Sequence, residues 1–528
     1  MSQRKLRVRD AMVVLVALLV LTGPAFGLPK AVSSAPSAAS SAADAALTSG
    51  DYQEALRQAE LGLKATPNDL ALRMQEIKAE MGLHQDMDAA RRAMALALAH
   101  PRHPEFRLAA GECAFQMGYI AQALQQWLQL KDTPGWQEKA YHLSILALMA
   151  TGQFGPARKL ALDAVSKAPH PWPLLVSDLC LVDHSPKDCL PPLQSLLTSK
   201  VPHSDYFAQL EGLFESAGPA GLFRYGTPSA TPLTIPVKEK NVQMDIPMVG
   251  ESGGYTISSW QTYSTSSSVV VPVSIGGAAK RWMVLDSGSS VMLIGEDTVK
   301  SLHLKPVSPA QYSGLGSGIT KQTEWVLCPK VTVGGAVIRN VPAMVIARHS
   351  DFWERRGICP LSLFRPWAIL FDRRHGRLTL YPSGTDPDAV LGPGTFRLPA
   401  IWSGAHPCAE ISIQGHPGCF CAIDTGAVNT AIVGRYAKSI GVQPLLGRFG
   451  GVRNLTVSGS FDSGLAENVS IQFGTQQLHM GVVQVAPFSL DGLFFPVYAN
   501  LGRDILDLYE GFYDWPHDVV AFKAYDKG

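Results

Sequence analysis

Two aspartates in the C-terminal half of this 528-residue chain stand in matching contexts and could do acid–base chemistry together. Each follows a short apolar run and precedes a hydroxyl residue and a glycine, giving Asp286-Ser287-Gly288 and Asp424-Thr425-Gly426. A helix-like segment comes after each tripeptide, at 296–302 and 433–440. Because the arrangement recurs 138 residues later, we interpret it as one structural unit used twice.

Two carboxylates within hydrogen-bonding distance cannot both ionise easily, so they share a proton and titrate as a pair. One can then take a proton from water while the other supplies one, which suits peptide hydrolysis without a metal or a covalent nucleophile. We therefore predict that Asp286 and Asp424 are the catalytic residues. The predicted supporting residues, which fix the two loops and let them approach closely, are Ser287, Gly288, Thr425 and Gly426.

The tripeptide alone is a weak signal, because Asp462-Ser463-Gly464 also matches it. No apolar run precedes this third copy, which follows Ser458-Gly459-Ser460. Asp and Ser favour turns through local hydrogen bonds to the backbone. We predict a turn there rather than part of the site.

The elements around the aspartates are predicted to be mainly strands. From residue 269 onward, β-branched runs separated by Gly and Asn predict strands at 269–274, 281–285, 331–333 and 377–381, and 519–522 predicts a closing strand. Residues 224–268, rich in Thr, Ser, Pro and Gly, predict a linker that includes a first strand. The repeated unit divides the rest into lobes at 269–395 and 396–528.

From about Val269 to Phe522 the chain resembles the pepsin and retropepsin superfamily, specifically its bacterial retropepsin-like branch. Besides the two tripeptides, Asn500-Leu501-Gly502-Arg503-Asp504 is similar to the apolar-apolar-Gly segment that lies beside an aspartate loop in that family. The resemblance implies a two-lobed acid-protease fold with a peptide or protein substrate in the cleft between the lobes. It also implies a flap hairpin, with Tyr312, Gly314 and Gly316 as candidates in the first lobe and Gly450-Gly451 in the second.

One residue departs from the family pattern. In the first lobe the corresponding segment is Gly357-Ile358-Cys359-Pro360, and Pro360 stands where glycine is usual. Proline has no backbone N–H to donate. The backbone around Asp286 is therefore expected to differ from that around Asp424.

Residues 45–223 carry a helical repeat. Prolines 67, 101, 134 and 169 are separated by 34, 33 and 35 residues, and glycines 50, 82, 118 and 152 follow the same rhythm. This resembles the tetratricopeptide family, without its early Trp. The resemblance implies an all-α solenoid, which either binds a protein partner on its concave surface or has no ligand. The helix predicted at 204–217 would cap it or pack on the next domain.

The N-terminus predicts export. Basic residues within 1–10 precede an apolar run at 11–21 and then Ala25-Phe26-Gly27, so we predict a signal peptide over 1–27, with an uncleaved anchor as the alternative. Residues 28–44, mostly Ala, Ser and Pro, predict a disordered tether. The expected location is periplasmic or secreted, in a bacterium, and only an uncleaved signal would place the chain at a membrane.

An oxidising compartment allows disulfides. The candidate pairs among the eight cysteines are Cys180 with Cys189, Cys408 with Cys419 or Cys421, and Cys328 with Cys359. Cys113 lies in a helical pattern and is expected to be a buried free thiol.

Other chemistries find no support in the sequence. The 45 basic and 44 acidic residues nearly balance, so no nucleic-acid partner is expected. The histidines, among them His406, are scattered and fit no metal-binding motif, and no cofactor motif occurs. The leading hypothesis is an aspartic endopeptidase. The alternatives are a non-catalytic scaffold with a pseudo-protease module, and a hydrolase of cell-wall peptides.

Overall fold

The computed structural model describes residues 37–83, 85–168, 172–199, 204–243, 265–313, 320–346, 357–403, 406–445, 452–455, 460–487 and 497–526. Within these residues a run of helices, α1 to α11, is followed by a mainly β region. The predicted fold class is therefore confirmed. The predicted signal peptide, 1–27, lies outside the described residues.

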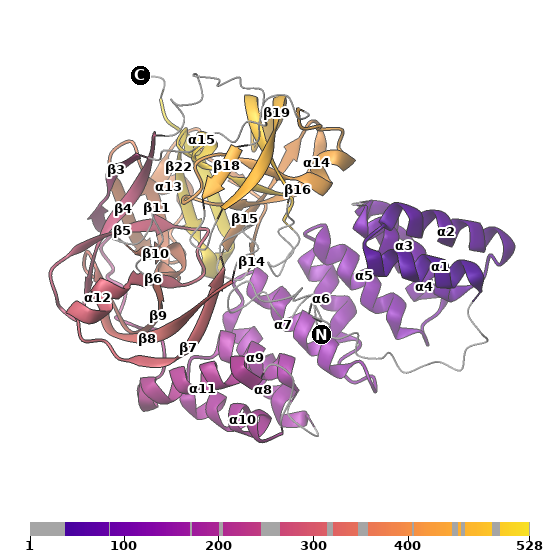
Figure 1. Cartoon of the computed structure of the whole chain (residues 1–528), viewed down its shortest axis with the longest axis horizontal. Helices are drawn as coiled ribbons and strands as arrows, with labels where there is room; N and C mark the ends of the chain where they lie inside the picture. Colours follow the sequence, from indigo (N-terminus) through magenta and orange to yellow (C-terminus); the bar gives the residue numbers. More distant parts are fainter. Residues whose placement is uncertain are drawn as a thin grey trace, which may run out of the picture. The chain divides into compact units, whose positions relative to one another are not determined.

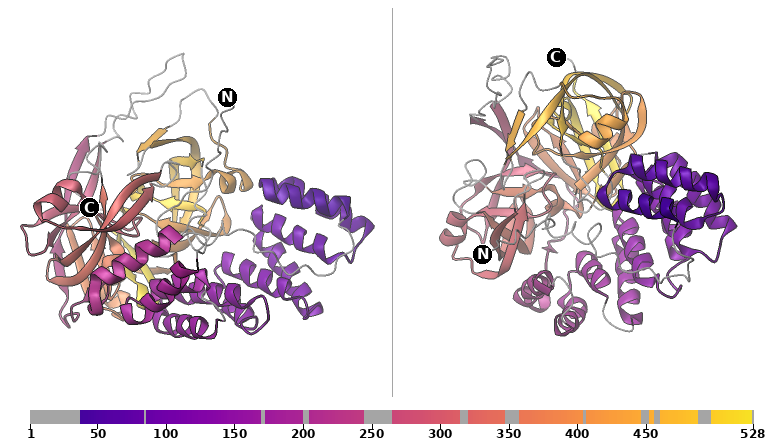
Figure 2. Two further views of the ribbon diagram at one scale, coloured as in Figure 1. Left: turned by 60° about the horizontal axis from the view of Figure 1, so that its bottom comes forward. Right: turned by 45° about the vertical axis from the view of Figure 1, so that its right-hand side comes forward.

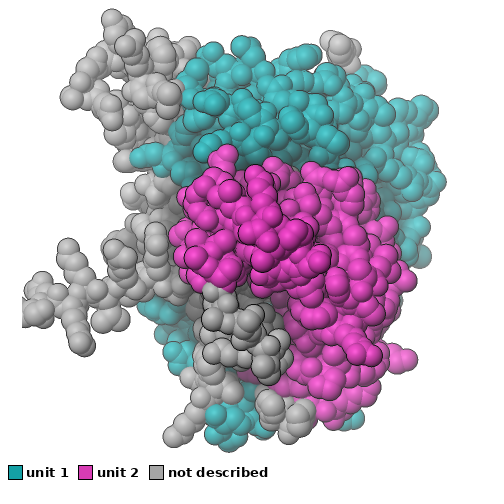
Figure 3. Space-filling view, turned by 90° about the vertical axis from the view of Figure 1, so that its right-hand side faces the viewer, with its two compact units in different colours: residues 1–22, 179–528 teal, residues 23–178 magenta. Residues whose placement is uncertain are grey.

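The chain forms two compact units, which divide after Asp178 (Figure 3). The helical unit contains α1 (Ala38–Ser49), α2 (Tyr52–Ala65), α3 (Leu70–Gly82), α4 (Asp86–Ala99), α5 (Pro104–Gln116), α6 (Ile120–Leu128), α7 (Gln137–Ala150) and α8 (Phe154–Lys167). Consecutive helices pack side by side as antiparallel neighbours (Figure 1). Small residues allow this close packing: a Cβ added at Gly82 would lie 2.3 Å from the Tyr52 ring.

Helix α1 begins inside the segment that composition assigned to a tether. Ser37 caps it by accepting a hydrogen bond from Ser40 N at 3.1 Å. Its many alanines favour helix, and Ala43 and Ala46 are buried. Packing against α2 and α3 supplies the stabilisation that a short helix lacks on its own.

Three more helices follow: α9 (Pro173–Val182), α10 (Pro186–Thr198) and α11 (Ser204–Ala217). The division between compact units falls within α9, whereas the sequence analysis extended the helical-repeat domain to residue 223. The reason is that α11 packs on the β-rich region. A Cβ added at Gly212 would lie 3.2 Å from the carbonyl oxygen of Val307, and Ser308 Oγ donates a hydrogen bond to Gln209 O at 3.4 Å.

The first lobe is built on a nine-stranded sheet of described strands. Its strands are β1 (Arg224–Tyr225), β3 (Lys238–Gln243), β4 (Thr265–Ile275), β5 (Arg281–Asp286), β6 (Met292–Gly295), β7 (Pro306–Ser313), β8 (Thr320–Val333), β9 (Ala336–Ile346) and β10 (Ile358–Pro360). β8 pairs with both β4 and β9, so the sheet curls on itself (Figure 2). The short helix α12 (Glu296–Ser301) follows β6 as predicted.

The second lobe repeats this plan in an eight-stranded sheet. Its strands are β14 (Ala400–Ser403), β15 (His406–Ile413), β16 (His416–Ile423), β17 (Ala431–Val433), β18 (Val452–Leu455), β19 (Ser460–Phe473), β20 (Gln476–Ala486) and β21 (Ala499–Leu501). Its helices are α14 (Gly434–Ser439) and α15 (Arg503–Leu506). β16 pairs in parallel with β21, as β5 pairs in parallel with β10.

A six-stranded sheet takes strands from both lobes. Its order is β13 (Phe396–Leu398), β23 (Val519–Ala524), β22 (Tyr509–Asp514), β11 (Trp367–Asp372), β12 (Arg377–Pro382) and β2 (Leu233–Pro236), and α13 (Pro387–Leu391) packs near β22 and β23. Thus the predicted linker, 224–268, supplies strands to two sheets. The pairing of β11 with β22 joins the lobes.

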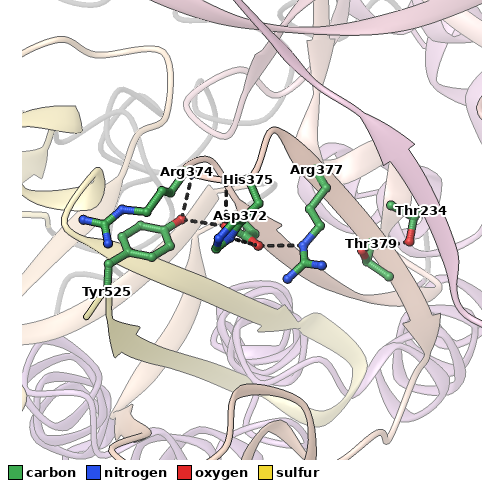
Figure 4. Close-up of polar contacts among 7 residues, drawn as sticks. All are labelled: Thr234, Asp372, Arg374, His375, Arg377, Thr379 and Tyr525. Carbon is green, nitrogen blue, oxygen red and sulfur yellow. Dashed lines mark hydrogen bonds and ion pairs between the residues drawn. The ribbon is translucent and has the colours of Figure 1, made fainter. Parts of the chain in front are cut away.

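A buried carboxylate marks the end of β11 in this sheet (Figure 4). Asp372 accepts hydrogen bonds from Arg377 Nε at 2.6 Å, from the His375 ring at 2.9 Å and from the Tyr525 hydroxyl at 3.1 Å. Asp514 is equally buried at the end of β22 and accepts from Ser383 Oγ at 2.6 Å. Asp372 therefore fixes the turn that follows β11, whereas Asp514 holds Ser383 in the turn that follows β12.

The predicted disulfides are absent, because all eight cysteines are free and buried. Cys408 pairs in register with Ala422, so it lies on the opposite face of the sheet from Cys419 and Cys421. Burial raises the pKa of Cys328, Cys359 and Cys408 to about 12, which keeps these thiols protonated. The expectation that Cys113 is a buried free thiol is confirmed.

Across the part of the chain that the structure describes, no helix combines the length and apolar character that crossing a bilayer requires.

Candidate active site

The two predicted aspartate loops come together at the ends of equivalent strands. β5 ends at Asp286 and lies parallel to β10, while β16 ends one residue before Asp424 and lies parallel to β21. The residues just before each aspartate, 283–285 and 419–423, are apolar and buried, so they hold the aspartates rigidly. Asp424 N donates to Leu501 O at 3.0 Å, which continues the β16–β21 pairing as far as the aspartate.

The hydroxyl residues of the two tripeptides lock the loops to each other. Ser287 N donates to Thr425 Oγ1 at 3.0 Å, and Thr425 N donates to Ser287 Oγ at 2.9 Å. In turn, Ser287 Oγ donates to Ile423 O at 2.6 Å and Thr425 Oγ1 donates to Leu285 O at 3.1 Å. Both side chains are buried, so each hydroxyl has its donor and acceptor capacity satisfied inside the protein.

The glycines bring the carboxylates together. A Cβ added at Gly288 would lie 2.5 Å from Asp424 Cγ, and one added at Gly426 would lie 2.6 Å from Asp286 Cγ. Each carboxylate thus packs directly on the glycine of the opposite loop. The loop backbones also donate to their own aspartates, from Gly288 N to Asp286 Oδ1 at 2.7 Å and from Gly426 N to Asp424 Oδ1 at 2.9 Å.

The electrostatics of the pair favour one shared proton. Burial, the nearby charge of Asp424 and a hydrogen bond with that carboxyl raise the pKa of Asp286 well above its usual range. Backbone N–H groups of Gly288 and Ser289 act in the opposite direction but do not cancel the effect. A pair in this state can hold one acid and one base at the same time.

Two further residues, which the sequence analysis did not assign to the site, contact the aspartate loops. Asn500 Nδ2 donates to Asp424 Oδ2 at 2.9 Å. His406 Nδ1 lies 3.1 Å from Ser287 O, and because a carbonyl only accepts, this nitrogen carries the proton. Burial lowers the pKa of His406, which keeps the ring neutral. Asn500 could have been noticed as a polar residue in an apolar-apolar-Gly segment. No feature of the sequence pointed to His406.

The structure accounts for Pro360. In the pairing of β10 with β5, Pro360 lies opposite Asp286. In the pairing of β21 with β16, Leu501 lies opposite Ile423, so Gly502 takes the equivalent position beside Asp424. Gly502 N donates to Thr430 Oγ1 at 3.1 Å. Six residues after Asp286, at the position equivalent to Thr430, the first lobe has the buried Met292. The first lobe therefore lacks both donor and acceptor, and replacing both partners with apolar groups leaves no unsatisfied polar atom.

The flap candidates fall at a hairpin whose tip is not described. Tyr312 lies near the end of β7 and pairs with Lys321 of β8. Gly314, Gly316 and the second-lobe candidates Gly450-Gly451 lie outside the described residues. The β7–β8 hairpin agrees with the expected element, while the roles of these residues stay predictions.

The third tripeptide does not form a turn, contrary to the prediction. Asp462, Ser463 and Gly464 lie within strand β19, where Asp462 pairs with Arg453 and is exposed. Ladder pairing with β18 and β20 overrides the local turn preference of Asp and Ser. Asp462 therefore differs from the other two aspartates in both burial and setting.

No group of three or more His, Cys, Asp or Glu side chains that could hold a metal ion occurs within the described ranges.

Comparison with known proteins identifies the region around Asp286. Residues 271–358 match the family model described as aspartyl protease, from β4 into β10. An aspartic proteinase from Irpex lacteus is 14% identical over 56% of this chain and 98% of its own, with a TM-score of 0.33. A tetratricopeptide repeat protein from Parabacteroides merdae is 15% identical over 34% of this chain and 70% of its own, with a TM-score of 0.27. No curated protein matches this chain.

Proposed function

We propose that this protein is an aspartic endopeptidase in which Asp286 and Asp424 activate water to hydrolyse a peptide bond. The observation that carries the proposal is the mutual packing of the two carboxylates, each on the glycine of the other loop. The match of residues 271–358 to the aspartyl protease model supports the same reaction class.

In this mechanism the pair begins with one proton. The ionised carboxylate takes a proton from the attacking water, and the protonated carboxyl gives its proton to the carbonyl oxygen of the substrate. When the resulting tetrahedral intermediate collapses, the leaving amine takes the proton that the base received from water. A hydroxyl of the intermediate returns its proton to the other carboxylate as the new carbonyl forms, so the pair again holds one proton. The buried lock between Ser287 and Thr425 would keep the carboxylates in place throughout.

The test is cleavage of a mixed peptide library from acidic to neutral pH by the wild type and by Asp286→Asn and Asp424→Asn. We expect the wild type to cut inside peptides and each variant to lose roughly 10³-fold in rate, because acid or base catalysis is removed. Circular dichroism checks that the variants are folded.

A matched control is Asp462→Asn, which changes the same tripeptide at an exposed position of strand β19. It should keep wild-type activity. If the Asp286 and Asp424 variants cut as fast as this control, the pair is not the catalytic centre. If all four proteins are inert at every pH, the non-catalytic scaffold becomes the better account.

Two further proposals rest on the sequence. Residues 1–27 direct export to the periplasm or the medium, and the helical unit binds a protein partner, which could be a substrate. Cell fractionation with N-terminal sequencing tests the first: an exported chain that starts at Leu28 supports a signal peptide, an exported chain that retains Met1 supports the uncleaved anchor, and a chain that stays in the cytoplasm contradicts export.

A further inference from the structure

The hydrogen bonds that the two aspartates accept differ by one donor. Each aspartate accepts from two backbone N–H groups of its own loop, those of Gly288 and Ser289 for Asp286 and those of Gly426 and Ala427 for Asp424. Among the residues that the structure describes, only Asp424 also accepts from a side chain, that of Asn500. The difference lies in the strands beside the loops.

The registers identify the residue that replaces Asn500 in the first lobe. Asn500 lies opposite Ala422, two residues before Asp424. Ile358 lies opposite Val284, two residues before Asp286. Ile358 is therefore the equivalent residue, and its buried apolar side chain offers no hydrogen bond.

We propose that Asn500 is a positioning residue that makes the pair asymmetric, so that Asp424 is the ionised base and Asp286 carries the shared proton. This inference rests on the proposed function. A carboxylate has no proton to donate, so the amide must present its Nδ2 group, and a hydrogen bond to the charged form stabilises that form. With three donors against two, the anion is held at Asp424.

Other charged or titratable groups near Asp424 do not supply this asymmetry. Among the described residues, the elements packed there carry Asp286 on β5, His406 on β15, Cys419 and Cys421 on β16, and Arg503 and Asp504 on α15. His406 donates to a backbone carbonyl and Asp504 accepts from Thr430, so neither is bonded to the pair. All of them remain unchanged when Asn500 is replaced.

The test is the pH dependence of kcat and kcat/KM for the wild type and for Asn500→Leu, which keeps the side chain's size but removes the donor. The acidic limb reports ionisation of the base. We expect it to move up by about 1 pH unit, because the anion loses a charge-assisted hydrogen bond. The value of kcat at the optimum should fall about tenfold, with KM changed less than about twofold.

Asn500→Asp is the second variant, because it keeps the shape of the side chain if the leucine variant does not fold. Its carboxylate repels that of Asp424 and should raise the acidic limb further. Asn68→Leu, the same change at an exposed turn of the helical unit, is the control and should alter nothing.

The outcomes separate the two claims. A wild type that cuts peptides, with an acidic limb that stays in place in both Asn500 variants, overturns this inference and leaves the proposed function intact. A rise in KM alone also overturns it, because Asn500 would then contact only the substrate. A wild type as inert as Asp286→Asn refutes the proposed function, and the inference falls with it.

Discussion

Each carboxylate at the proposed site touches the opposite loop where a glycine leaves room for it. The added Cβ at Gly426 would lie within 2.6 Å of Asp286, which is far closer than nonbonded carbon atoms approach. The neighbour that would have to move is the carboxylate itself. A side chain at this position should therefore damage the chemistry more than the fold.

We predict that Gly426→Ala lowers kcat about 100-fold, because displacing a carboxylate by about 1 Å disrupts the geometry of proton transfer. Steady-state kinetics and thermal unfolding together test this. Gly481→Ala is the control, since a Cβ there meets nothing within 4 Å. Equal activity of the two variants would show that the carboxylates do not need this close approach.

At this scale the sequence revealed the aspartates, but not all of their partners. Asp286 and Asp424 could be predicted because the motif and its apolar strand are local in sequence. Asn500 donates to a residue 76 positions away, so its contact depends on the pairing of β16 with β21. The predicted pairing of Cys408 with Cys419 or Cys421 failed for a similar reason, since the strand register decides which face of the sheet each sulfur occupies.

Among the elements, the six-stranded sheet holds the lobes together through β11 and β22. The sequence predicted β12 and β23 from their β-branched runs. It could not predict that β2 would pair with β12, because Thr234 and Thr379 lie 145 residues apart. The turns after β11 and β12 each depend on a buried aspartate, Asp372 and Asp514, which makes these carboxylates stability determinants.

Asp372 should make the sheet sensitive to acid. Burial alone would raise the pKa of Asp372, but hydrogen bonds from Arg377 and His375 outweigh it and lower the pKa below its usual value. A pKa that is lower in the folded state than in the unfolded state stabilises the protein at pH values above the unfolded-state pKa of ~4. This stabilisation is lost as the pH falls through the folded-state pKa. Asp372→Asn should cost about 2 kcal/mol at neutral pH and flatten the acid dependence below about pH 4.

Denaturant unfolding at several pH values measures this effect. The control is Asp388→Asn, whose partner Arg397 and own carboxylate are both more than half exposed, so its loss should be near zero. If Asp372→Asn and Asp388→Asn unfold alike at every pH, the buried cluster does not stabilise the sheet.

For the whole molecule, the division between units does not coincide with the change from helix to strand. The sequence placed the boundary at 223 because helical periodicity ends there. Packing places it after Asp178, because α11 packs on β7 and β8 as well as on α10. The buried apolar residues of α11 are Tyr206, Phe207, Leu210, Leu213, Phe214 and Ala217. A periodic pattern identifies a helix but does not reveal the surface on which it packs.

Two fragments distinguish these boundaries. A chain starting at Trp172 keeps α9 to α11 and all the aspartate-loop residues, so it should fold and cut short peptides within about threefold of the full-length rate. A chain starting at Arg224 uncovers β7 and β8 and should lose roughly 3 kcal/mol or more of unfolding free energy, from the apolar surface exposed. Denaturant unfolding and peptide cleavage measure both. If the two fragments are equally stable and active, α10 and α11 belong with the repeats, and their packing on β7 and β8 contributes nothing to the two-lobed region.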